Sequence, residues 1–207
     1  KTPPPPPLSS RHLSNARLYA DRYDMIRGLN IPVGCKIAEI GVWRGDFSKF
    51  LIETLKPAEL HAFDLFDQSS DTEVWGQPVE SYFDGMSRKE FYKKRFEDSA
   101  TRIELYEGLT TDILPLARNG YFDLVYIDAG HDYINATYDA SQAVRMTSSN
   151  GVIIFNDYIM TDPLCGVPYG VVQAANELAV SSDWKFIALA LNSHMFCDVA
   201  LKVCNNN

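Results

Sequence analysis

The sequence predicts an α/β fold in which a mostly parallel sheet of seven strands carries helices on both faces. Two observations support this: short apolar segments alternate along the chain with amphipathic helical patterns, and turn-forming residues separate them. With 207 residues, 46% of them hydrophobic, the chain can bury one substantial core but not two comfortable ones. We therefore expect a proline-rich tail over residues 1–12 and a single domain over residues 13–207.

The amino-terminal part is expected to be an extended tail followed by a helix. Residues 3–7 are consecutive prolines, which favour an extended polyproline conformation and cannot join a packed helix. Residues 14–29 place apolar and tyrosine side chains at helical spacing and predict an amphipathic helix that ends near Gly28. Packing on the core is the simplest role for this helix. The alternative is that Tyr19 and Tyr23 roof a substrate pocket.

Strand-like and helix-like segments then alternate. The expected strands are 36–40, 60–64, 102–106, 124–128, 152–156, 186–191 and 199–203. The expected helices are 47–55, 88–96, 111–117, 133–146 and 171–180. Ser87 and Glu90 form a capping-box pattern at the start of the second of these helices. Because ligands of parallel sheets bind at the carboxyl ends of the strands, that edge is the place to look for a site.

Polar residues stand at several of these strand ends. Asp64 ends the second strand, Asp128 the fourth, and Asn156 with Asp157 the fifth. A single acid at a strand end is usually a loop or capping residue. Several of them at one edge of a sheet are harder to explain in that way, so we expect them to form a site.

The segment IAEIGVWRG, residues 37–45, predicts a strand, a tight turn and the start of a helix. Glycines at Gly41 and Gly45 allow a sharp turn and a close approach of the backbone to a ligand, and Glu39 can accept hydrogen bonds from hydroxyl groups. The middle glycine of the dinucleotide fingerprint GxGxxG is missing. The segment therefore indicates a nucleoside site without a pyrophosphate clamp.

Composition excludes several classes of function. The chain has 19 basic and 27 acidic residues, a net charge of −8 and a pI near 4.9, so it lacks the basic surface that a nucleic-acid phosphate backbone requires. No segment approaches the length of a transmembrane span and no signal pattern is present, which predicts a cytoplasmic protein. The cysteines are scattered without a CxxC pair and are expected to be reduced: Cys35, Cys165, Cys197 and Cys204.

Taken together, EIGVWRG at residues 39–45, the acid Asp64 and YIDAGHDY at residues 126–133 resemble class I S-adenosylmethionine-dependent methyltransferases. The resemblance runs from about residue 36 to residue 203. It is strongest to macrocin-type and related sugar O-methyltransferases, which carry an IDAxHxY segment and an ND, HD or DD pair at the next strand end. It implies a Rossmann-like sheet with an antiparallel last strand, S-adenosylmethionine as methyl donor, and a small hydroxylated metabolite as acceptor.

The resemblance also implies a set of cofactor-binding residues: Glu39, Gly41, Gly45, Asp64, Thr110 and Asp128. The two glycines would line the methionine part of the donor, with Glu39 near its amino group. Asp64 would accept hydrogen bonds from both ribose hydroxyls, as a carboxylate can. Leu109 replaces the polar residue often found after the glycine of the next loop, so adenine recognition would fall to Thr110 or to backbone groups. Capping of the following helix is the alternative role of Thr110.

Two solutions are available for activating a hydroxyl acceptor, and they are not exclusive. His131, with Asp128 and Asp157 as further catalytic residues, is the candidate general base; a helix that begins beside the histidine would disfavour the imidazolium and keep the ring neutral. Asp128, Asn156 and Asp157 are candidate ligands for a divalent cation such as Mg²⁺, which prefers oxygen donors. An ordinary loop contact is the alternative role of His131.

The segment between the second strand and Ser87 is long and rich in aromatic residues, including Trp75, Tyr82 and Phe83. It is a candidate lid over the acceptor, with a surface excursion or a dimer contact as the alternatives. The loop 161–170 is expected to border the acceptor site. Two other functions stay open: a nucleotide-cofactor oxidoreductase on a similar sheet, and a non-catalytic adenosyl-binding module. Self-association of the chain is also left open.

Overall fold

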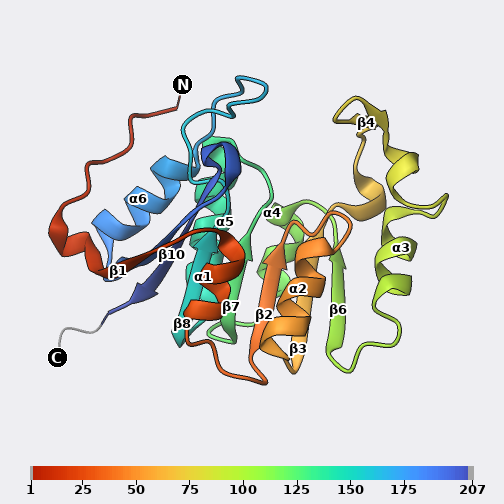
Figure 1. Cartoon of the computed structure of the whole chain (residues 1–207), viewed down its shortest axis with the longest axis horizontal. Coiled ribbons are helices and arrows are strands. Elements are labelled where there is room, and N and C mark those ends of the chain that lie inside the picture. The colour runs from red at the N-terminus through yellow and green to blue at the C-terminus, as the bar shows by residue number, and fades with distance from the viewer. Residues whose placement is uncertain (1, 205–207) are drawn as a thin grey trace.

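A computed structural model describes residues 2–204. Its centre is an eight-stranded sheet in the order β1-β9-β10-β8-β7-β2-β3-β6, and a separate two-stranded hairpin is formed by β4 and β5. All pairings in the large sheet are parallel except those of β10, which runs antiparallel to β8 and β9. This is the Rossmann-like sheet with the antiparallel last strand that the sequence predicts (Figure 1).

The elements closely follow the predicted ranges. The strands are β1 Leu13–Tyr19, β2 Lys36–Ile40, β3 Glu59–Asp64, β4 Glu73–Val74, β5 Gln77–Pro78, β6 Arg102–Glu107, β7 Phe122–Ile127, β8 Thr147–Phe155, β9 Trp184–Leu191 and β10 Cys197–Val203. The α-helices are α1 Arg22–Gly28, α2 Asp46–Leu55, α3 Arg88–Arg95, α4 Thr110–Ile113, α5 Tyr133–Met146 and α6 Val171–Ser181. Short 3-10 turns are η1 Ser10–His12, η2 Phe66–Gln68, η3 Val79–Tyr82, η4 Leu114–Leu116 and η5 Ser193–Met195.

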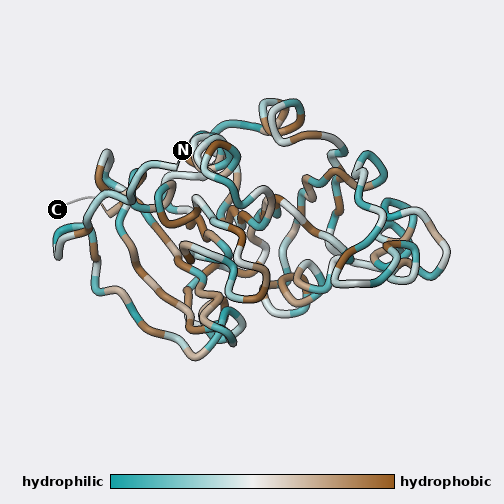
Figure 2. The backbone as a smooth tube through the Cα atoms, turned by 90° about the horizontal axis from the view of Figure 1, so that it is seen from above, coloured by the Kyte–Doolittle hydropathy of each residue, from teal (hydrophilic) through white to brown (hydrophobic). Residues whose placement is uncertain are grey.

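The sheet separates two apolar cores. On one face, the strands pack against α4, α5 and α6 through residues such as Ile113, Ala140 and Ala175. On the other face they pack against α1, α2 and α3, through residues such as Met25 and Leu51. Figure 2 shows the apolar stretches running along the inner segments of the chain. Helices on both faces leave the ends of the strands as the place where side chains can meet a ligand.

The predicted helix over 14–29 is wrong in its first half. Leu13–Tyr19 forms β1, which pairs in parallel with β9 and adds an eighth strand to the predicted seven. Only Arg22–Gly28 is helical, and the side chain of Asp21 caps it by accepting a hydrogen bond from the amide of Asp24 at 2.8 Å. The strand depends on backbone hydrogen bonds to a segment about 170 residues further along the chain, which local spacing does not reveal.

The proline-rich tail lies along α6. The side-chain amides of Gln173 and Asn176 donate hydrogen bonds to the carbonyl oxygens of Pro3 and Pro6, at 3.2 and 2.9 Å. Leu8 packs against the core on that face. The tail is therefore extended, as the prolines predict, and it is docked on the domain.

The aromatic segment after β3 lies beside the turn that follows β2. The ring of Trp43 packs against Trp75, Tyr82 and Phe83 at centroid distances of 5.8, 5.8 and 5.1 Å. Trp75, at the tip of the β4–β5 hairpin, remains 77% exposed. Figure 1 shows this hairpin at the β6 and α3 side of the molecule. In this conformation the segment covers the turn after β2, and its predicted role as an acceptor lid stays a prediction.

None of the helices among the described residues has the length and apolar content needed to cross a membrane.

Candidate functional site

The predicted strand-end residues lie along one edge of the sheet. Ile40 is in register with Phe63 on one side and with Ile127 on the other, and Ile127 is in register with Phe155. The residues that follow these positions therefore form a row: Gly41, Asp64, Asp128 and Asn156. The structure confirms that the strand ends are neighbours, as the parallel order predicted.

Gly41 is the point where the turn after β2 touches the end of β7. Its φ is +85°, and a Cβ added there would lie 1.9 Å from the carbonyl oxygen of Asp128. Gly45, with φ +76°, is the N-cap of α2. Only glycine fits Gly41, because any side chain would collide with backbone at a left-handed conformation. The turn thus brings backbone amides close to the sheet edge, a cradle of the kind that a nucleoside cofactor requires.

Asp64 fastens this turn to the end of β3. Its Oδ2 accepts hydrogen bonds from the amides of Val42 and Trp43 at 2.7 and 3.2 Å, and its Oδ1 accepts one from Phe66 at 2.8 Å. Trp43 and Phe66 both have positive φ. A carboxylate has about four acceptor positions, so these bonds leave room at Oδ1 for one ribose hydroxyl. For Asp64 to accept hydrogen bonds from both ribose hydroxyls, as predicted, one of its hydrogen bonds from a backbone amide would have to break.

Glu39 is buried beneath α2, and only 1% of its surface is exposed. Its Oε2 accepts a 2.6 Å hydrogen bond from the hydroxyl of Ser48, which in turn accepts one from Tyr92 at 2.9 Å. Burial raises the pKa of Glu39 to about 8. The side chain therefore joins β2 to α2 and α3, and its predicted contact with the amino group of the donor stays a prediction.

Thr110 is the first residue of α4, whose N-cap is Leu109. The predicted alternative, that Thr110 caps this helix, is therefore wrong. Its hydroxyl lies next to Asp139 of α5, a carboxyl with no exposed surface. Burial raises the pKa of Asp139 to about 6. Thr110 thus follows the end of β6, at the edge where the adenine was predicted.

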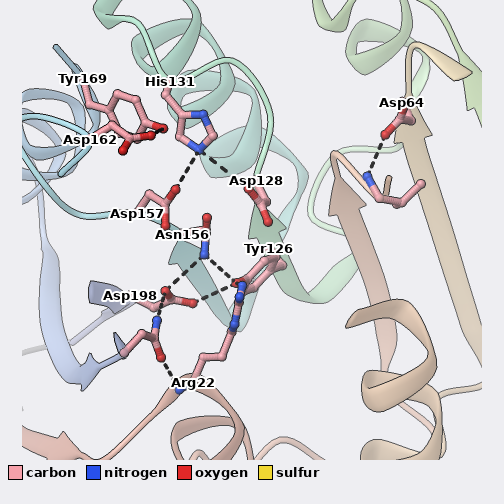
Figure 3. A network of polar contacts seen from close by, with 12 residues as sticks. Arg22, Asp64, Tyr126, Asp128, His131, Asn156, Asp157, Asp162, Tyr169 and Asp198 are labelled. Carbon is pink, nitrogen blue, oxygen red and sulfur yellow. Dashed lines mark hydrogen bonds and ion pairs between the residues drawn. The ribbon is translucent and has the colours of Figure 1, made fainter. Parts of the chain in front are cut away.

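His131 lies between two carboxylates. Its Nε2 is 3.6 Å from Oδ1 of Asp128 and 3.5 Å from Oδ2 of Asp157, distances of ion pairs that are longer than hydrogen bonds (Figure 3). The imidazole stacks on Tyr169, with centroids 4.5 Å apart and planes 15° apart. The backbone carbonyl of His131 accepts a 2.7 Å hydrogen bond from the amide of Gly170. The 161–170 loop therefore borders this cluster, as predicted.

Neighbouring carboxylates act on His131 in the opposite sense to the predicted effect of the helix start. Burial lowers its pKa, but the neighbouring carboxylates of Asp128, Asp157 and Asp162 outweigh burial and raise the pKa above its ordinary value. Burial and the charge of Asp128 raise the pKa of Asp157 to about 6. Nearby charges thus outweigh burial at His131.

Asn156 is part of a buried polar network that the sequence did not predict. Its Nδ2 donates hydrogen bonds to the hydroxyl of Tyr126 at 3.2 Å and to Asp198 at 3.1 Å. Tyr126 donates to the other oxygen of Asp198 at 2.8 Å, and Arg22 of α1 donates to Tyr126 at 3.1 Å. Since the amide nitrogen points into this network, the oxygen of Asn156 is the atom turned toward Asp157 and Asp128 (Figure 3).

One sequence signal for this network was present. Asp198 is an acid between apolar residues of β10, and such a residue needs a buried partner. Neither Arg22 nor Tyr126 could have been assigned to it from local spacing, because they come from distant parts of the chain.

The candidate ligands are of the chemical type that a divalent cation prefers, but they do not form a complete coordination site. Asp128, Asp157 and the oxygen of Asn156 face one another, and oxygen is the ligand that Mg²⁺ prefers. Within the described part of the chain, no group of three His, Cys, Asp or Glu side chains is placed to hold a metal ion. A cation here would rely on Asn156, water and substrate for its remaining ligands.

Two hollows lie away from this site. One, of about 400 Å³, is lined by Lys89, Lys93, Phe96, Ile103 and Leu105. The other, of about 510 Å³, lies between β1 and the loop after α1, and its lining includes Arg17, Tyr19, Asp123 and Lys202. Neither contains a residue of the strand-end row. The site is thus identified by its converging side chains and not by an enclosed cavity.

Comparison with known proteins adds the family. A family described as a methyltransferase domain matches residues 38–158, which is more than half of the chain and includes the turn after β2, Asp64, Asp128 and Asp157. No curated protein matches the chain.

Solved structures share the fold at low sequence identity. The O-methyltransferase TomG of Streptomyces achromogenes, in complex with SAM, is 20% identical, with a TM-score of 0.62 over 89% of this chain and 80% of that one. An O-methyltransferase of Bacillus cereus, in complex with SAH, is 17% identical, with a TM-score of 0.63 over 87% and 80%. The tRNA methyltransferase TrmK of B. subtilis is 12% identical, with a TM-score of 0.54 over 89% and 66%.

Proposed function

Because this chain belongs to the methyltransferase domain family and is an S-adenosylmethionine-dependent methyltransferase, we propose that its acceptor is a hydroxyl group of a small molecule. The family sets aside the oxidoreductase and the non-catalytic binding module as explanations of the site. The chemical class of the acceptor is inferred from the residues that face it.

The observation that carries the proposal is the position of His131 between Asp128 and Asp157, with the ring of Tyr169 stacked on it. An alcohol is a poor nucleophile until its proton is removed, so a hydroxyl acceptor needs a base within reach. The closeness of Asp128 to the glycine turn supports a base at His131, beside the turn that would hold the donor. A site for a nucleophile that is already deprotonated would not need such a cluster.

The donor supplies an electrophilic methyl group when it is bound. The residues of this chain then have two tasks: to align the acceptor oxygen with that methyl group and to accept the proton of the hydroxyl. Alignment alone is worth up to about 7–11 kcal/mol in well-ordered systems. His131 would accept the proton at Nε2, and Asp128 and Asp157 would stabilise the imidazolium that forms.

A divalent cation is the second way to activate the acceptor, and we propose it as an addition to the base. Asp128, Asp157 and the oxygen of Asn156 would hold the ion, which would lower the pKa of the hydroxyl and orient it. The carboxylates of Asp128 and Asp157 would thus interact with both His131 and the ion. A bound cation would therefore lower the pKa of His131 and make the imidazole a base at a lower pH.

A small acceptor is favoured over a nucleic acid. The net charge of −8 and the acidic residues around His131 would repel a phosphate backbone. The tRNA methyltransferase among the structural neighbours shows that this fold also serves nucleic acids. Transfer RNA therefore belongs in the test as a competing acceptor.

The test is methyl transfer from S-adenosylmethionine to a panel of sugars, glycosides, catechols and unmodified tRNA, with added Mg²⁺ or with a chelator. We expect turnover on a hydroxylated small molecule. Asp157→Asn should abolish any stimulation by Mg²⁺, while Asp98→Asn, at an exposed acid after α3, serves as the control. Methylation of tRNA alone would contradict the proposed acceptor. If neither Mg²⁺ nor the chelator changed the activity of the wild-type protein, the proposed role of a cation would be contradicted and only the general base would remain.

A further inference from the structure

Arg22 is a cation beside the site to which the sequence assigned no role. It is the first residue of α1, and its backbone amide donates a 2.9 Å hydrogen bond to the side chain of Asn192. Figure 3 shows its side chain reaching from α1 to Tyr126, with Asp128 beyond. The hydrogen bond to Asn192 and the capping of α1 by Asp21 fix the backbone position from which the side chain of Arg22 extends.

The guanidinium group of Arg22 is held by neutral partners. It donates to the hydroxyl of Tyr126 at 3.1 Å and lies over the ring of Phe47 at 5.3 Å. Within the described residues, Arg22 forms no ion pair with a carboxylate. A guanidinium has five N–H donors, and one of them is used here by a side chain. Most of its hydrogen-bonding capacity is thus left for a ligand.

The nearest acids do not neutralise this charge by direct contact. Asp198 is reached only through the hydroxyl of Tyr126, and burial raises the pKa of Asp198 to about 7. Burial acts to lower the pKa of Arg22, but Tyr126, Asp198 and Asp128 more than compensate and raise it. Arg22 therefore keeps its charge at every relevant pH, in a partly buried position.

Two neighbours locate this charge relative to the donor. Tyr126 lies in β7 and Asp128 directly follows the last residue of that strand, where its amide still bonds to the carbonyl of Ile40, so both side chains leave the same face. Phe47 is the second residue of α2, directly after the turn that ends at Gly45. Arg22 thus lies between the glycine turn and Asp128, where the resemblance puts the methionine part of the donor.

We propose that Arg22 binds the carboxylate of the methionine part of S-adenosylmethionine. A guanidinium fork matches a carboxylate in two parallel hydrogen bonds, and the pair is strong where water is partly excluded. The carboxylate is the one anionic group of the donor, and Arg22 is a cation at that end of the site without a direct counter-ion. Binding by Arg22 would also anchor α1 over the filled site.

Arg44 is the other cation to consider, because it belongs to the glycine turn itself. Its guanidinium lies 5.4 Å from the ring centre of Phe91 in α3. That contact directs it toward α3 and away from Tyr126 and Asp128. Arg22 is therefore the better candidate.

The test compares two ligands by calorimetry: S-adenosylmethionine, and its decarboxylated form, which keeps the sulfonium and the amine. In Arg22→Gln, affinity for S-adenosylmethionine should fall by about 10- to 100-fold, because a hydrogen-bonded charge pair is lost. Affinity for the decarboxylated ligand should change by less than about twofold. Arg27→Gln removes an exposed cation from the same helix and should affect neither ligand.

The outcomes separate binding from structure. Equal losses for both ligands in Arg22→Gln would mean that Arg22 only supports the fold, and would overturn the proposal. An unchanged affinity for S-adenosylmethionine would overturn it as well. If Arg22→Gln does not fold, Arg22→Lys can replace it, because it keeps the charge but lacks the guanidinium fork. This variant should have a lower affinity for S-adenosylmethionine and an unchanged affinity for the decarboxylated ligand. None of these measurements uses an acceptor, so a wrong acceptor assignment would leave their result intact.

Discussion

The two halves of the strand-end row differ in how far the chain satisfies its own polar groups. In the donor half, around β2 and β3, Asp64 accepts three backbone hydrogen bonds and Glu39 is bonded to Ser48. In the acceptor half, around β7 and β8, Nε2 of His131 has no hydrogen-bond partner although two carboxylates flank it. The carboxylates of the donor half are thus hydrogen-bonded, whereas a buried ring nitrogen of the acceptor half lacks a partner among the described residues.

This difference corresponds to two different tasks. Binding a rigid nucleoside is favoured by a preorganised frame whose polar groups do not have to rearrange. Proton transfer needs groups whose protonation can change, and unsatisfied buried groups with shifted pKa values provide this. Backbone strain does not distinguish the halves, because Asp157 has a positive φ of 53° and Trp43 and Phe66 have φ of 48° and 45°.

The two halves meet at Gly41, and a substitution there should disturb both. In Gly41→Ala the new Cβ would lie 1.9 Å from the carbonyl oxygen of Asp128 at φ +85°, so β2 and β7 would have to separate. We expect a stability loss of at least about 2–4 kcal/mol, from left-handed strain plus overpacking, and loss of donor binding. Thermal unfolding and calorimetry measure both effects.

Gly76→Ala is the matched control for this prediction. Gly76 has a similar φ of +74°, but nothing lies within 4 Å of an added Cβ. It should therefore cost only the conformational strain, about 1–2 kcal/mol, and leave donor binding unchanged. Equal effects of the two substitutions would show that the contact between the halves is unimportant.

In the acceptor half, His131→Ala should reduce turnover without weakening the donor. Loss of a general base lowers kcat by about 10²- to 10⁴-fold. Because the pKa of His131 is raised, wild-type kcat should increase as pH rises through a value above the ordinary 6.5, and the variant should lack this increase. His194→Ala, at an exposed histidine in η5, is the control. Unchanged turnover in His131→Ala would remove the base from the mechanism.

In the donor half, Asp64→Ala should weaken donor binding and also loosen the turn. The substitution leaves the amides of Val42, Trp43 and Phe66 without their acceptor. We expect a loss of affinity of about 10- to 100-fold together with a stability loss of about 1–3 kcal/mol. Asp64→Asn keeps the shape and one acceptor oxygen, so it should retain more of the stability. Undiminished affinity in Asp64→Ala would contradict the ribose contact.

The sequence predicted the framework better than the contacts. The alternation of apolar segments identified β2, β3, β6, β7 and β8 and placed Asp64, Asp128 and Asp157 at one edge, because parallel order alone requires it. It did not predict β1, whose strand form depends on β9. It also did not predict the effect of the carboxylates on the pKa of His131, because their positions depend on loops and not on local pattern.

A pH-dependent effect on stability is expected at Glu39, and it tests how completely the polar groups of the donor half are satisfied. The pKa of Glu39 is raised from 4.5 to about 8 by burial, so the folded state binds its proton more tightly than the unfolded state. Its contribution to stability is therefore fully present below the unfolded pKa and declines as pH rises toward the folded pKa. Glu39→Gln cannot ionise and should lack this decline. Urea unfolding at about pH 5, 7 and 9 should show a free-energy gap between variant and wild type that widens with pH. A gap that stays constant would mean that Glu39 is solvated or paired with a cation, and that the cradle is less complete than its hydrogen bonds indicate.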